Sequence, residues 1–155
     1  MANPFPFVAG SVLEAAQLNG IGEATTAYTP TLGGITIGNG TVSSFFTRVN
    51  KLVYGSVRIV LGSTSSITST VTFTLPVTAS ANSGALLVGS GYFFDNSSGE
   101  TYTGQTLRST TTTITPFVSF TLGTNFVVRS LINATAPVVA DVNDQIVYQF
   151  TYEAA

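Results

Sequence analysis

Three residue types are missing from this 155-residue chain, which contains no histidine, no cysteine and no tryptophan. Without histidine and cysteine the usual zinc ligands are absent, and a serine nucleophile would have no histidine as its base. Without cysteine no disulfide can form, although this leaves the redox compartment open. We therefore expect a protein that is not an enzyme and that holds no cofactor.

Charged side chains are scarce as well. They make up 8% of the residues, against about 25% in a typical soluble domain. The net charge is −2 and no basic patch is present, which argues against a nucleic-acid partner. Because a surface so poor in charge is prone to self-association, we expect large areas that other protein subunits cover.

A long apolar run is also absent. The mean hydropathy is +0.40, yet no segment approaches the length of about 20 apolar residues that a spanning helix requires. The N-terminus has Pro4 and Pro6 and no basic residue, unlike a signal peptide. We expect no membrane partner, and a product of cytoplasmic translation.

Acidic side chains remain available for acid-base catalysis or for binding a calcium ion. Asp141 with Asp144, or Asp95 with Glu100, would be the paired carboxylates of a hydrolase, but both pairs lie in predicted loops. The turn after Asp95 offers oxygen ligands for calcium, namely Asp95, Asn96 and Glu100. A simple solvated turn is the favoured interpretation of these residues.

Residues 1–24 are predicted to form an extended arm and a short helix. Pro4 and Pro6 disfavour helix in the arm, whereas Ser11 and Glu14 form a capping box where the helix begins. A helix this short is unstable alone, so it must dock either as a strap on its own domain or on a partner. The side chains predicted to bind a partner are Phe5, Phe7, Val12, Leu13 and Leu18.

From about residue 25 the apolar pattern changes to a period of two, which is typical of strands. The strands are predicted at residues 41–50, 51–61, 70–75, 86–94, 111–122, 125–132 and 146–152. The turn Gly38-Asn39-Gly40 favours a hairpin, and Pro116 indicates an edge strand or a bulge. The inward faces are predicted to carry Val53, Val57, Ile59, Leu61, Val71, Phe73, Leu75, Ile114, Pro116, Val118, Phe120, Leu122, Ile146, Tyr148, Phe150 and Tyr152.

Many short strands separated by glycine and asparagine turns predict an all-β fold. We expect an antiparallel β-sandwich, jelly-roll-like, preceded by the N-terminal arm and helix, with a closed barrel as the second choice. The chain divides into the arm and helix at 1–24 and the sandwich domain at 25–155.

Several segments, in order along the chain, carry a resemblance to known proteins. They are residues 7–19 (FVAGSVLEAAQLN), 46–57 (FTRVNKLVYGSV), 71–76 (VTFTLP) and 143–152 (NDQIVYQFTY). Together they resemble segments of bacteriophage virion-surface proteins, the capsid decoration proteins and the distal modules of tail fibres and tailspikes. Where that pattern commonly has glycine after the arginine, this chain has Val49 and Asn50.

The resemblance implies a phage structural protein that forms a homotrimer. We expect a decoration, or cement, protein on the outer capsid surface, bound to the major capsid protein. The alternative is a receptor-binding module at the tip of a fibre or spike that recognises a host surface glycan. Such recognition would use exposed aromatic residues, although aromatics on alternating strands are more often core; the candidates are Tyr28, Tyr92, Phe93, Phe94 and Tyr102.

Overall fold

The computed structural model describes residues 25–81, 87–122 and 126–155. Within these ranges the chain forms strands and no helix. The strands are β1 (Thr26–Ala27), β2 (Leu32–Thr36), β3 (Thr41–Val49), β4 (Leu52–Val60), β5 (Ser66–Thr74), β6 (Leu87–Asp95), β7 (Glu100–Arg108), β8 (Thr113–Leu122), β9 (Phe126–Leu131) and β10 (Gln145–Glu153). The all-β prediction is confirmed, and the predicted arm and helix at residues 1–24 lie outside the described residues.

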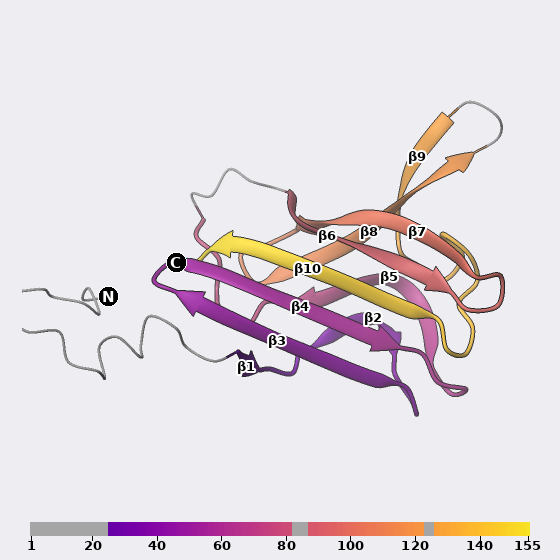
Figure 1. The fold of residues 1–155 in the computed structure, drawn as a ribbon, viewed down its shortest axis with the longest axis horizontal. Coiled ribbons are helices and arrows are strands. Elements are labelled where there is room, and N and C mark those ends of the chain that lie inside the picture. The colour runs from indigo at the N-terminus through magenta and orange to yellow at the C-terminus, as the bar shows by residue number, and fades with distance from the viewer. Residues whose placement is uncertain (1–24, 82–86, 123–125) are drawn as a thin grey trace, which may run out of the picture.

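The strands join one ten-stranded antiparallel sheet in the order β1-β3-β4-β10-β6-β7-β8-β5-β2, with β9 paired to β8 off this path. The sheet curls like half a barrel, so that β3, β4 and β10 face the viewer while β5 and β2 lie behind them (Figure 1). The antiparallel prediction is confirmed. The finer prediction of two separate packed sheets is not, because the hydrogen bonds follow one continuous path.

The core lies inside the curl, between the inward faces of β4 and β10 and those of β5 and β8. Tyr148 lies opposite Val57 across the β10–β4 ladder, and its hydroxyl donates to the carbonyl oxygen of Phe117 on β8 at 2.9 Å. The predicted inward residues are buried, with Leu75 and Phe120 partly buried against the core; the side chain of Leu122 lies outside what the structure describes. The period of two therefore identified the inward faces correctly.

The turn around Asn39 does not form the predicted hairpin. β2 pairs with β5, whereas β3 pairs with β4 and β1, so the turn joins strands near opposite edges of the sheet. The Asn39 side chain fixes it there: its oxygen accepts from the backbone N–H of Thr64 at 2.9 Å, and its amide donates to the Ser63 hydroxyl at 3.0 Å. A turn sequence specifies a chain reversal, but it does not select the strand that pairs.

Pro116 does not mark an edge strand, because β8 pairs on both sides. On one side β8 pairs with β7. On the other, β5 pairs with it at Ile114 and β9 pairs from Phe117 onward. Pro116 lies where this second ladder changes partner. A residue without a backbone N–H is tolerated at such a break in the ladder.

Candidate interaction surface

The residues predicted to bind a partner lie in residues 1–24, outside the described part of the chain. They are Phe5, Phe7, Val12, Leu13 and Leu18. The structure therefore does not place them relative to the sheet. It does show the surfaces on residues 25–155 that a partner would meet.

One of these surfaces is the outward side of β3, β4, β10 and β6, which we call the outer face. Its apolar side chains are half-buried and lie outside the core cluster; they are Phe45, Tyr54, Val60, Tyr92, Phe94 and Val147. In Figure 1 these four strands run side by side, and no other described strand crosses in front of β3, β4 and β10. Among the described elements, none covers this apolar side.

Strand register brings the members of the outer face together. Val147 on β10 lies opposite Arg58 on β4 and opposite Tyr92 on β6, forming a row across three strands. The Phe45 and Tyr54 rings lie near the other end of the face, with their centroids 6.4 Å apart. Residues far apart in sequence thus form one continuous surface.

Near one end of the outer face, Arg58 and Gln145 form a polar pair. The Arg58 guanidinium donates through Nε and Nη2 to the Gln145 side-chain oxygen, at 3.2 and 3.0 Å. Within the described chain no carboxylate forms an ion pair with Arg58; the ion pair seen there joins Lys51 to Glu153 at 3.5 Å. The side-chain partner of Arg58 is thus a neutral amide.

The aromatic residues proposed for glycan recognition separate into two groups. Phe93 is 1% exposed, and Tyr28 and Tyr102 pack against the core. Tyr92 and Phe94 lie on the outer face instead. Sequence reasoning did not single out Tyr54, although the predicted inward set Val53, Val57 and Ile59 on the same strand already implies that Tyr54 points outward.

The described acidic side chains of Asp95, Asp141 and Asp144 accept hydrogen bonds that shape their own loops. Both oxygens of Asp95 accept hydrogen bonds from Ser97 and Ser98, and the Ser97 hydroxyl bond is the main reason that the pKa of Asp95 is lowered. Among the described residues no group of acidic side chains is placed to hold a metal ion. The turn after Asp95 is held by serines, as the simple-turn interpretation predicted.

Asp144 is fully buried and connects two loops. Its carboxylate accepts the backbone N–H of Asn96 at 2.9 Å and that of Asp141 at 2.7 Å. Burial raises the pKa of Asp144, because desolvation disfavours the charged form. Asp141 and Asp144 thus act together in shaping a loop.

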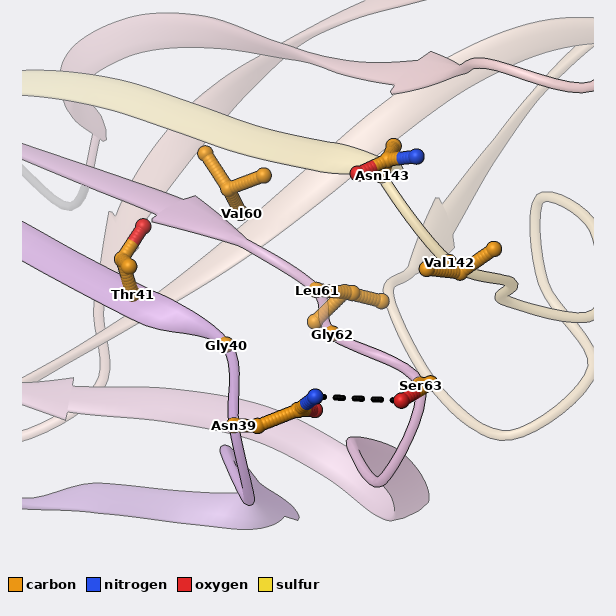
Figure 2. A pocket seen from close by; sticks show the side chains of 9 residues that line it. All are labelled: Asn39, Gly40, Thr41, Val60, Leu61, Gly62, Ser63, Val142 and Asn143. Carbon is orange, nitrogen blue, oxygen red and sulfur yellow. Dashed lines mark hydrogen bonds between the residues drawn. The ribbon is translucent and has the colours of Figure 1, made fainter.

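An open pocket of about 290 Å³ lies near the turn at Asn39 (Figure 2). It is lined by Asn39, Gly40, Thr41, Val60, Leu61, Gly62, Ser63, Val142 and Asn143. No titratable side chain is among them, and Asn39 and Ser63 are already hydrogen-bonded to each other. The pocket offers no acid, base or activated nucleophile.

Comparison with models of known protein families, with curated proteins and with solved structures finds no match. Among the described residues no helix is long and apolar enough to cross a membrane.

Proposed function

We propose that this protein is a structural protein of a bacteriophage virion, a homotrimeric decoration protein that binds and reinforces the outer surface of the capsid. Its partners are further copies of itself and the major capsid protein. It has no enzymatic activity, and its action is mechanical: each trimer bridges neighbouring capsid subunits, and repetition by symmetry multiplies the effect.

The outer face is the observation that carries this proposal. Interface cores are rich in aromatic residues and arginine and poor in other charges. The outer face shares aromatic residues and an arginine with that composition, namely Phe45, Tyr54, Tyr92, Phe94 and Arg58. The sequence resemblance to virion-surface proteins supports the same assignment.

The proposal includes the finer fold implied by the resemblance, a jelly-roll-like sandwich. The two halves of the curled sheet face each other across the core, much as two layers would. The hydrogen bond from Tyr148 on β10 to Phe117 on β8 crosses between these halves. An experimental structure of the assembled oligomer would test whether the halves close into two layers.

Copy number in purified virions tests the proposed function. We expect a stoichiometry near one per major capsid subunit, measured by quantitative mass spectrometry against that subunit. A decoration protein must cover the whole shell, whereas a tip protein is present in a handful of copies. Complete absence from the particle would contradict the assignment to a virion.

A receptor-binding module at a fibre or spike tip is the second candidate. Tyr92 and Phe94 lie beside the Arg58–Gln145 pair, and aromatic rings next to amide and guanidinium groups suit a host surface glycan. Low copy number together with binding on a glycan array would favour this candidate over the capsid protein.

A further inference from the structure

The outer face requires a partner of particular chemistry. Arg58 is solvent-exposed on this face, and its hydrogen-bond partner is the neutral amide of Gln145. Val147 and Tyr92 continue its row across the sheet. The complementary partner is therefore an apolar segment that carries a carboxylate.

The chain itself contains such a segment. Residues 1–24 include Glu14 and Glu23 and no lysine or arginine. The same segment carries the apolar residues Phe5, Phe7, Val12, Leu13 and Leu18. Its charge and its apolar content both complement the outer face.

The direction of β1 indicates which copy of the outer face this segment meets. Thr26 pairs with Phe46 and Ala27 with Phe45, so β1 begins at the side of this short ladder that is nearer to Val49. Arg58 lies opposite Ser43, near the other end of β3. β1 therefore begins at the side of β3 that is farther from Arg58 of the same copy, which favours Arg58 of a second copy as the contact. A fully extended residue spans about 3.3 Å, so 24 residues can span at most about 80 Å.

The size of the outer face also suits a protein segment. Four strands spaced about 4.8 Å apart, with about 3.3 Å per residue along each, give a flat area of roughly 600 Å². A stable interface buries about 800 Å² on each partner. The two areas are comparable, so an occupant that covers most of this face would form an interface of ordinary size.

We infer that residues 1–24 of a second copy dock on the outer face, with Glu14 against Arg58. This rests on the proposed function, that of an oligomeric structural protein, and it names the interface that holds the oligomer together. Each copy donates its segment to the next, which is a head-to-tail contact. Such contacts close into a ring when the rotation between copies allows it, as a trimer requires.

A charge exchange tests the inference on the full-length chain. The oligomer mass is measured by light scattering after size exclusion, for Arg58→Glu, for Glu14→Arg and for the double variant. We expect each single reversal to raise the dissociation constant by about tenfold or more, and the double variant to recover most of the loss.

Glu23→Arg is the matched control, because the inference assigns Glu23 no contact with Arg58, and it should leave the oligomer unchanged. Arg58→Gln, with far-UV circular dichroism of every variant, separates loss of assembly from loss of folding. A monomeric full-length chain overturns the inference, as does a double variant no better than the single ones. If the double variant regained thermal stability as a monomer, residues 1–24 would dock on their own copy. That result would also overturn the inference.

These outcomes are separable from the copy-number test. Absence of the protein from virions would contradict the proposed function, whereas the charge exchange would still measure the mass of the oligomer. A monomer found at high copy number on capsids would contradict the inference but not the proposed function.

Discussion

Asp95 and Asp144 are neighbouring buried carboxylates, and their surroundings shift their pKa values in opposite directions. Hydrogen bonds from Ser97 and Ser98 lower the pKa of Asp95, whereas burial raises the pKa of Asp144. Asp95 therefore contributes stability that is present above its unfolded pKa and is lost as the pH falls through its folded value. The contribution of Asp144 runs the other way: it is present at low pH and is lost as the pH rises through its folded pKa.

At the residue scale, we predict that Asp95→Asn lowers the free energy of unfolding by about 1–2 kcal/mol near neutral pH, because charge-assisted hydrogen bonds are lost. The difference from the parent protein should shrink below about pH 4, where Asp95 of the unfolded chain is already protonated. Urea unfolding across this pH range measures both quantities.

Glu153→Gln is the control for that series. The side chain of Glu153 is 51% exposed and pairs with Lys51 at the surface, where ion pairs contribute little. If Asp95→Asn lowered the free energy of unfolding equally at neutral and acid pH, the charged carboxylate of Asp95 would not be the source of the stability.

At the scale of the strands, β6 and β10 approach closely because Gly91 has no side chain. Gly91 lies opposite Tyr148, whose ring occupies the space beside it. A Cβ atom at Gly91 would fall within 3.0 Å of both the Val147 carbonyl oxygen and the Tyr148 ring. The backbone oxygen cannot move away without breaking the ladder.

We predict that Gly91→Ala lowers the free energy of unfolding by about 3 kcal/mol, because overpacking displaces Tyr148 from the core. Thermal and urea unfolding measure the loss. Ser90→Ala, at the adjacent exposed position on the same strand, should change stability by no more than about 0.5 kcal/mol. Equal stability of the two variants would show that β10 can move away from β6.

At the scale of the whole molecule, residues 25–155 contain all the described strands and the core cluster. The C-terminus is held within this sheet, since Ala154 donates to the carbonyl oxygen of Lys51 at 2.7 Å and Ala155 to that of Thr78 at 2.9 Å. We expect these contacts to form without residues 1–10.

We predict that deleting residues 1–10 leaves the midpoint of thermal unfolding within about 4 °C of the parent value, because the core is unchanged. The same deletion should abolish retention on capsids, because Phe5 and Phe7 are removed from the segment that binds a partner. Co-sedimentation with purified capsids measures retention. Unchanged occupancy would contradict a binding role for this segment.

Much of the fold was predictable from the sequence because it depends on local pattern. The strands around Val57, Phe73 and Tyr148 were located with their inward faces, since a period of two defines which side is buried whatever the neighbouring strand. β7 was missed because its run of threonine, glycine and glutamine shows little apolar alternation. β2 was missed because it is short and contains two glycines.

By itself, the sequence determined that the chain is all-β, which side chains face inward, and that histidine and cysteine chemistry is excluded. Only the tertiary structure decided that β10 lies between β4 and β6 and that β2 pairs with β5. Backbone hydrogen bonds are the same for every residue, so the order of strands follows from packing of the whole chain. For that reason the outer face, where Arg58 meets Gln145 across 87 residues, became visible only in the folded molecule.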